Sequence, residues 1–493
     1  MPAGHQRIVN YMEVTEKSRQ VVDPRRLELA TDPHRPLYHF LPPANWMNDP
    51  NGAIFWDGRF HLFYQHNPHG AFWGTIHWGH AVTDDLVHWT DLPIALAPDP
   101  DGPDRSGCAS GTAVAGADVP TLIYYGIPDG YCIATSDDDL VTWKKHPANP
   151  VIPHPPEGTE EGRAFDPCAW REGDEWYSLS GGQIEGVGDT SFLFRSDDLV
   201  KWDYIGQFYE TGTENDCAVP DFFPLGGKHM LLFASHLRGV QYYIGSYENQ
   251  RFVPEHHGRM NFGGFMGGNL SAGITLLDGR GRRIFFGWIP EGRSDEVQRA
   301  SGWAGVMSLP RVLSLRGDGM LGIEPEPELT VLRREHREYS DLVIPADSSV
   351  PLKGADGECL EVAVTFKPGA AEEYGIKVRR APDGSEETII SHSRPDGMLT
   401  LDVERSSRSS DVEGETLQVG PLSLKAGEPL ELRVFVDRSV VEAFANGRQC
   451  LTKRIYPSRP DSLGVELFAK GGVATASSAD VWQMGAVWPG SQS

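Results

Sequence analysis

The chain has 493 residues, with 44 Lys and Arg against 69 Asp and Glu, which gives a formal net charge of −25. This acidic balance argues against nucleic acid or an anionic membrane as the main partner, because both bind basic patches. A hydrophobic content of 39% is enough to build a full core and excludes a disordered acidic tail. The 55 Gly, 37 Pro and 21 Phe indicate short strands joined by tight turns rather than long helices.

The N-terminal residues 1–30 are polar and predict an arm or loose segment. They lack the apolar stretch of about 7–15 residues that a secretory signal requires. No stretch approaches the roughly 18 apolar residues of a membrane span. The sequence therefore predicts a cytoplasmic protein, or a secreted one if a signal peptide has been removed. Six scattered cysteines without a CxxC pair predict buried free thiols.

Residues 31–335 contain an internal repeat. The run DDLVHW at 84–89 returns as DDLVTW at 138–143 and as DDLVKW at 197–202. A strand-like apolar segment recurs beside it, as GRFHLFYQ (58–65), PTLIYYG (120–126), DEWYSLSG (174–181), KHMLLFAS (228–235) and RRIFFGW (282–288). Repeats of four short strands are typical of a β-propeller, so five copies predict five blades. We interpret the DDLV runs as blade turns, not as acidic clusters.

The pattern changes after two prolines within 321–336, where ELTVLRRE offers a short helix-like stretch. From about residue 340 the chain alternates polar and apolar residues, as in CLEVAVTF and LELRVFVD, with frequent turns. This pattern predicts a β-sandwich over 336–493. The predicted fold is therefore all-β: a five-bladed β-propeller followed by a C-terminal β-sandwich, the latter structural, with Glu442 and Asp437 in structural roles.

Carboxylates recur where the inner strands of the blades are expected to converge. Asp49 in PPANWMNDPNG and Asp166 in AFDPCAW each precede a proline, which restricts the aspartate to an extended or turn conformation. A further acidic group, Glu214, Asp216 and Asp221, lies in ENDCAVPDFF. Paired carboxylates perform glycosyl transfer, so these residues, with tryptophans nearby, predict a sugar pocket.

At these residues the sequence resembles glycoside hydrolase family 32, the β-fructosidases. The resemblance rests on NWMNDPNG, FYQHNP, WGTIHWGHAVTDDLVHW, ASGTAV and FDPCAW, and extends over about residues 36–485. It implies a retaining enzyme without a metal or other cofactor, acting on fructose-containing oligo- or polysaccharides. It implies that Asp49 is the nucleophile and that Asp166 stabilises the transition state. The positions that it matches to the lining of the fructose pocket are Asn48, Gln65, Trp73 and Ser110.

The sequence departs from the family pattern at the second aspartate. The family has Arg directly before this residue, whereas Phe165 stands there in this chain. Arg163 lies two residues earlier, on the same side of a strand, and is therefore a candidate for the same region of the pocket.

The second departure concerns the proton donor, for which the family has a Glu-Cys-Pro run. Alignment on Cys217 makes Asp216 the acid/base, whereas alignment on Pro220 places Ala218 there, which cannot transfer a proton. We favour Asp216, with Glu214 as the alternative, and expect a strand bulge before Pro220. Burial and neighbouring negative charges are expected to raise the pKa of this acid.

Three alternatives to the hydrolysis of β-fructofuranosides remain open at this stage. Water and a second sugar compete for the same intermediate, so fructosyl transfer, including formation of a cyclic difructose, is possible. A non-catalytic sugar-binding relative and a five-bladed glycosidase acting on arabinose or xylose chains are the others.

Overall fold

The computed structural model describes residues 23–154, 162–184, 188–209, 216–260 and 262–488. Short helices α2 (Pro24–Leu29) and α3 (Asp295–Ser301) and a 3-10 helix (Pro327–Leu332) accompany a fold built from strands. The prediction of an all-β fold is confirmed. No helix among the described residues is both long and apolar enough to cross a membrane.

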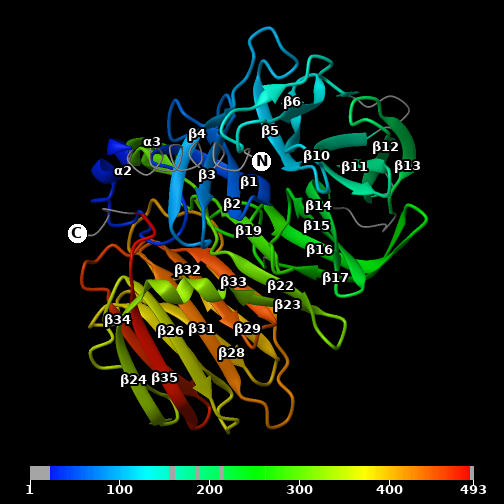
Figure 1. Cartoon of the computed structure of the whole chain (residues 1–493). Coiled ribbons are helices and arrows are strands. Elements are labelled where there is room, and N and C mark those ends of the chain that lie inside the picture. Colours follow the sequence, from blue (N-terminus) through cyan, green and yellow to red (C-terminus); the bar gives the residue numbers. More distant parts are fainter. Residues whose placement is uncertain (1–22, 155–161, 185–187, 210–215, 261, 489–493) are drawn as a thin grey trace, which may run out of the picture.

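The first part of the chain forms five antiparallel sheets in sequence order (Figure 1). The first contains β1 (Asn45–Trp56), β2 (Arg59–Asn67), β3 (His77–Thr83) and β4 (Trp89–Leu96), with β20 (Trp303–Ala304) parallel to β1. The second contains β5 (Gly107–Ala113), β6 (Thr121–Ile127), β7 (Gly130–Thr135), β8 (Lys144–Lys145) and β9 (Ile152–Pro153). The third contains β10 (Gly162–Glu172), β11 (Glu175–Ile184), β12 (Gly188–Ser196) and β13 (Asp203–Gln207).

The fourth and fifth sheets complete this part. The fourth contains β14 (Ala218–Leu225), β15 (Lys228–Ser235), β16 (Gly239–Glu248) and β17 (Arg251–Arg259). The fifth contains β18 (Gly273–Leu277), β19 (Arg283–Ile289), β22 (Arg311–Leu315) and β23 (Leu321–Pro325), and β21 (Val306–Met307) pairs with β19. The first strands contact one another in the order β1, β5, β10, β14, β18 and back to β1. Each first strand therefore has two other first strands as neighbours.

The sequence repeats occupy equivalent places in these sheets. Each apolar repeat segment lies in the second strand: β2, β6, β11, β15 or β19. The DDLV runs are turns after the third strand, as predicted, and their leucines Leu86, Leu140 and Leu199 share a positive φ of 63–66°. Asp85 accepts hydrogen bonds from the backbone of Val87 and His88, so this acidic side chain stabilises its own turn.

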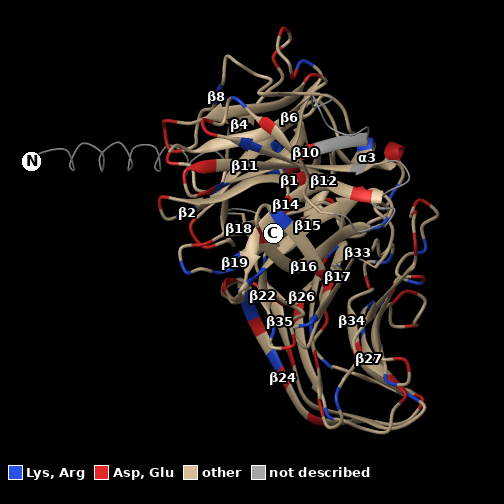
Figure 2. Cartoon of the chain, turned by 90° about the vertical axis from the view of Figure 1, so that its right-hand side faces the viewer, with Lys and Arg blue, Asp and Glu red and all other residues tan. Residues whose placement is uncertain are grey.

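The second part of the chain forms two six-stranded antiparallel sheets (Figure 2). One contains β24 (Arg333–Ile344), β35 (Ala474–Met484), β26 (Cys359–Phe366), β31 (Leu430–Asp437), β32 (Val440–Ala445) and β33 (Gln449–Arg454). The other contains β25 (Ser348–Pro351), β34 (Gly464–Lys470), β27 (Glu373–Arg380), β28 (Thr388–Ser393), β29 (Met398–Asp402) and β30 (Leu417–Pro421). Residues of both sheets share one apolar core, including Val362 and Val434 from the first and Ile376 and Leu467 from the second. This arrangement is a β-sandwich.

The N-terminal residues from 23 onward are packed on the molecule rather than loose. Asp23 caps helix α2 by accepting from the backbone of Arg25. The buried Arg26 pairs with Asp91 and lies 3.4 Å above the ring of Trp488. Residues 1–22 lie outside the described part of the chain.

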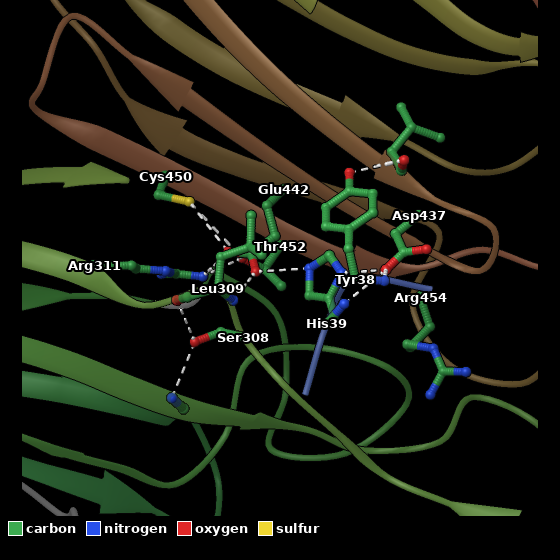
Figure 3. A network of polar contacts seen from close by, with 12 residues as sticks. Tyr38, His39, Ser308, Leu309, Arg311, Asp437, Glu442, Cys450, Thr452 and Arg454 are labelled. Atoms are coloured by element: carbon green, nitrogen blue, oxygen red, sulfur yellow. Dashed lines mark hydrogen bonds and ion pairs between the residues drawn. The ribbon is translucent and has the colours of Figure 1, made fainter. Parts of the chain in front are cut away.

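A buried polar network joins the two parts of the molecule (Figure 3). Asp437 of the sandwich accepts hydrogen bonds from the backbone of Leu37, Tyr38 and His39, at 2.7–2.8 Å. Glu442 accepts from the backbone of Leu309. Asp437 and Glu442, which were predicted to be structural, therefore lie at the contact between the two parts.

Candidate active site

Asp49 lies near the beginning of β1, where the pairing with β2 is interrupted between Met47 and Pro50. The side chain is buried and accepts hydrogen bonds from three predicted pocket residues. Ser110 Oγ donates to Oδ2 at 2.6 Å, Gln65 Nε2 to Oδ2 at 3.2 Å, and Asn48 Nδ2 to Oδ1 at 3.1 Å. Strands β1, β2 and β5 thus converge on one carboxylate.

Burial and these hydrogen-bond donors have opposite effects on the ionisation of Asp49. Burial raises the pKa of Asp49, while the hydrogen bonds of Ser110 and Asn48 and the positive charge of His236 oppose the rise. Trp46 Nε1 donates to Asn48 Oδ1 at 2.8 Å, which orients the Asn48 amide toward Asp49. A carboxylate held in this way has a defined direction in the pocket.

Asp166 lies on β10, again at an interruption of the pairing, between Phe165 and Pro167. Burial and the negative charge of Asp49 raise its pKa to about 7, against the charge of His236 and a hydrogen bond from the Val219 backbone. The charge of Asp49 therefore acts on Asp166. Two carboxylates that disfavour each other's charge are a frequent feature of catalytic sites.

Asp216, directly before β14, pairs with His236 in the turn between β15 and β16. The backbone N–H of His236 donates to Asp216 Oδ1 at 2.8 Å, and the ring Nδ1 is hydrogen-bonded to Oδ2. Although burial opposes the effect, these bonds and the charge of His236 lower the pKa of Asp216. The expectation of a raised pKa at Asp216 is therefore wrong, because the hydrogen bonds and charge of His236 outweigh the effect of burial.

An aromatic row continues from His236 to the first strand. Its ring lies 5.2 Å from the ring of Phe265, which lies 6.1 Å from Trp288, and Trp288 lies 6.0 Å from Trp46. His236, Phe265 and Trp288 were not among the residues predicted from the sequence. The available signal for His236 was the run HLRG (236–239), which immediately follows the fourth apolar repeat segment.

Asp221, the third member of the predicted acidic group, belongs to a different place. Its Oδ2 accepts from the backbone N–H of Thr275 at 2.7 Å and from Thr275 Oγ1 at 2.6 Å. It lines a cavity of about 940 Å³ together with residues 53–56, 112–117, 168–172 and 274–277. These are the later halves of the first strands and the residues that follow them, whereas Asp49 and Asp166 precede them.

The remaining predicted residues are placed as follows. Trp73 is 61% exposed, in the connection between β2 and β3. Arg163 belongs to β10 by its backbone, and its side chain lies outside the described part of the structure, as does Glu214. All six cysteines are free and buried, as predicted. No group of three or more His, Cys, Asp and Glu residues suited to a metal ion occurs within the described ranges.

Comparison with known proteins decides the family. Residues 39–325 match the family model for the glycosyl hydrolases family 32 N-terminal domain, and residues 328–483 match that for the C-terminal domain of the same family. The chain belongs to glycoside hydrolase family 32. The resemblance read from the sequence motifs is thereby confirmed, and the protein is a glycoside hydrolase.

Similar members of the family are aligned over most of their lengths. A sucrose-6-phosphate hydrolase of Escherichia coli is 34% identical over 91% of this chain and 95% of its own. A levanase of Bacillus subtilis is 33% identical over 92% of this chain and 71% of its own. The crystal structure of fructan 1-exohydrolase IIa from Cichorium intybus has a TM-score of 0.84 at 27% identity, covering 92% of this chain and 98% of that one.

Proposed function

We propose that this family 32 protein is a retaining β-fructofuranosidase that releases fructose from sucrose or from fructans of the inulin or levan type. The observation that carries the proposal is the buried Asp49, which receives donors from three strands and is electrostatically coupled to Asp166. The names of the similar proteins, a sucrose-6-phosphate hydrolase and a levanase, favour this substrate class.

In the proposed mechanism Asp49 attacks the anomeric carbon of the fructosyl unit while an acid protonates the leaving oxygen. The fructosyl unit then remains bonded to an oxygen of Asp49 until water displaces it. Donation by Ser110 and Asn48 opposes the rise in the pKa of Asp49 that burial causes. Gln65 adds a third hydrogen bond, which helps to orient the carboxylate. Asp166 accepts hydrogen bonds from sugar hydroxyls and stabilises the positive charge of the oxocarbenium-like transition state.

We also propose that the five sheets are the blades of a closed five-bladed propeller over residues 31–335, with the sandwich over 336–493. The ring of contacts among the first strands supports closure. The pairing of β20 with β1 supports it further, because a late segment of the chain then completes the first sheet. Closure explains how strands far apart in sequence present their side chains to one pocket.

The test is a panel of sucrose, inulin and levan, with the products separated by chromatography. We expect the wild-type protein to release fructose, and Asp49→Asn to lose several orders of magnitude in turnover while remaining folded. The matched control is Asp57→Asn, since Asp57 occupies the exposed turn between β1 and β2 and has a φ of 46° that Asn tolerates. Near-normal activity of Asp49→Asn would contradict the proposal, and a cyclic difructose or longer fructans would indicate transfer instead of hydrolysis.

A further inference from the structure

We propose that the sandwich helps to determine how the leaving group of the substrate is bound. Residues of the sandwich hold the loop at residues 262–268 in place, and Phe265 and Met266 of this loop form the wall of the candidate site on the leaving-group side. This inference rests on the proposed function, because it concerns the sugar unit from which the fructosyl unit is cleaved. It adds a part in substrate binding to the structural role of the sandwich.

Phe265 lies in the wall of the candidate site. On one side its ring packs in an apolar cluster with Trp46, which precedes Asp49 by three residues on β1. On another side it packs in a cluster with Val219, whose backbone forms a hydrogen bond with Asp166. Phe265 therefore contacts the neighbours of both carboxylates.

The side of the site that Phe265 borders is the one nearest Asp216, the favoured proton donor. Asp216 is hydrogen-bonded to His236, and the ring of His236 lies 5.2 Å from that of Phe265. The bulge expected before Pro220 is present in the same segment, since the pairing of β14 is interrupted after Ala218. In a retaining mechanism the proton donor stands beside the leaving oxygen. The leaving sugar is therefore expected on the side of the site where Phe265 lies.

The loop that carries Phe265 has little rigidity of its own. It reads FGGFMGG over residues 262–268, so glycine occupies most of its positions. Glycine loses more backbone freedom on ordering than any other residue. Met266 is 48% exposed beside Phe265, and its flexible side chain can adapt to a bound molecule. Contacts from outside the loop are therefore needed to hold these two side chains in one position.

Asn269, directly after the loop, connects the loop to the sandwich. Its buried side chain donates through Nδ2 to the backbone oxygens of Gly264 and Met266, both at 2.9 Å. Its Oδ1 accepts from Gln418 Nε2 at 2.6 Å and from Lys453 Nζ at 2.9 Å. Gln418 belongs to β30 and Lys453 to β33, so two strands of the sandwich act on the loop through one amide.

Two charged residues of the sandwich bind the loop directly. Lys453 Nζ also donates to the backbone oxygen of Gly267. Burial lowers the pKa of Lys453 to about 8, although the charge of Glu415 opposes the decrease. A buried ammonium group is unfavourable unless it is hydrogen-bonded, so these contacts stabilise both Lys453 and the loop. Glu415 Oε2 accepts from the backbone N–H of Gly264 at 2.9 Å.

The closest contact between the sandwich and the loop joins two glycines. A Cβ atom at Gly414 would lie 2.9 Å from the Cα atom of Gly267 and 3.0 Å from its backbone oxygen. The adjacent residue Glu413 donates its backbone N–H to the Gly292 oxygen at 2.8 Å, which fixes the sandwich segment on the first part of the chain. A side chain at Gly414 must therefore displace the loop.

The decisive experiment uses the full-length protein, the substrates of the panel that it cleaves, and free fructose as an inhibitor without a leaving group. In Gly414→Ala we expect KM to rise about tenfold or more, with kcat changed less than about threefold, because binding of the leaving sugar is weakened. The inhibition constant of fructose should stay within about twofold of the wild-type value. A loss of folded protein would lower the apparent kcat and leave KM unchanged, so it cannot produce this pattern.

Gly427→Ala is the matched control. Gly427 is also a glycine of the sandwich with a positive φ, 80° against 97° for Gly414, but a Cβ atom there meets nothing within 4 Å. The two variants therefore add a similar backbone strain and differ in the contact with the loop.

A second pair of variants tests the wall and its support. Phe265→Ala removes the ring, and we expect the same rise in KM with unchanged inhibition by fructose. If Gly414→Ala does not fold, as judged by circular dichroism, Glu415→Ala replaces it, because Glu415 is exposed and its loss frees the Gly264 N–H. Glu415→Gln keeps an acceptor oxygen and should restore the wild-type KM.

The outcomes separate this inference from the proposed function. A wild-type protein that cleaves no substrate of the panel, or an Asp49→Asn protein with near-normal activity, overturns the proposed function and the inference with it. If the wild type is active and Asp49→Asn is not, but Gly414→Ala or Phe265→Ala leaves KM unchanged, only the inference is overturned. It is also overturned if KM and the inhibition constant of fructose rise together, because the loop would then act on the fructose pocket itself.

Discussion

Asp49 and Asp166 are aspartates whose ionisation costs the folded state free energy, because burial disfavours the charged form of each. Burial raises the pKa of both, and burial together with the charge of Asp49 raises that of Asp166 to about 7. A fold selected for stability alone would not bury two carboxylates of which one raises the pKa of the other. Carboxylates with perturbed pKa values are frequent in active sites, even where they lower stability.

The first prediction concerns Asp166→Asn. We expect kcat on the best substrate of the panel to fall about 10²–10³-fold, because in the proposed mechanism Asp166 acts mainly in the transition state. KM is expected to change much less. Steady-state kinetics check this, with Asp174→Asn in the exposed β10–β11 turn as the control. A defect confined to KM would contradict the assigned role.

The same variant carries a prediction about stability and pH. The folded pKa of about 7 lies above the ordinary value of 3.8, so ionisation of Asp166 costs the folded state free energy as pH rises from about 4 to 7. Asparagine does not ionise. Asp166→Asn should therefore melt at the same temperature as the wild type near pH 4 and a few degrees higher at pH 8, as measured by calorimetry. If the variant and the wild type melted at the same temperature at pH 8 as well as at pH 4, the charge of Asp166 would not destabilise the folded protein.

Residue by residue, the sequence predicts the surroundings of Asp49 better than those of Asp216. Asn48 adjoins Asp49 in the motif NWMNDPNG, and the motifs FYQHNP and ASGTAV contain its partners Gln65 and Ser110. The pairing of Asp216 with His236 bridges 20 residues and joins a segment before one strand to the turn after the next. No local spacing indicates such a contact, because it depends on how β14 and β15 are paired.

At the scale of elements, the strands of the candidate site share one feature, an interruption of the strand pairing. Pairing is interrupted in β1 at Asn48 and Asp49, in β5 at Ala109 and Ser110, and in β10 at Asp166. Such β-bulges change the direction of a side chain without ending the strand. The Asp-Pro pairs signal two of them, since proline cannot donate to the ladder. The bulge at Ser110 has no such signal in the sequence.

The second strand of the third sheet carries the next prediction. Gly181 of β11 pairs with Phe165 of β10, and a Cβ atom at Gly181 would lie 1.3 Å from the backbone oxygen of Cys217. Gly181→Ala must therefore displace the segment that carries Asp216. We expect sucrose cleavage to fall at least about tenfold and stability to fall by about 1–3 kcal/mol.

Activity assays and thermal unfolding check the Gly181 prediction. The control is Gly317→Ala, because a Cβ atom there meets nothing within 4 Å. If Gly181→Ala is destabilised but cleaves sucrose normally, the close packing of Gly181 against the Cys217 backbone stabilises the fold but is not needed to position Asp216.

At the scale of the whole molecule, the order of the two parts follows from the sequence, but their contact does not. The repeats predict the first part and the alternating strands predict the second. The contact depends on Glu442, whose carboxylate lies between His39, at 3.2 Å, and Arg311. These three residues are fully buried and come from the N-terminal segment, the fifth sheet and the sandwich (Figure 3).

The final prediction concerns Glu442→Gln. Burial opposes ionisation, but the charges of Arg311 and His39 lower the pKa of Glu442 to about 2, against an ordinary value of 4.5. Glutamine leaves the Arg311 guanidinium buried without its counter-charge, and breaking a buried pair in this way costs about 3–5 kcal/mol. Because a lowered pKa stabilises the folded state above the unfolded value, the loss should be complete above pH 4.5 and shrink as pH falls toward 2.

Chemical denaturation across this pH range measures the effect, with Glu431→Gln, an exposed residue of the adjacent strand β31, as the control. At a temperature where Glu442→Gln remains folded, its kcat should equal that of the wild type, because Glu442 joins the two parts and does not take part in the chemistry. A stable Glu442→Gln protein that has lost activity would place part of the catalytic machinery at this contact instead.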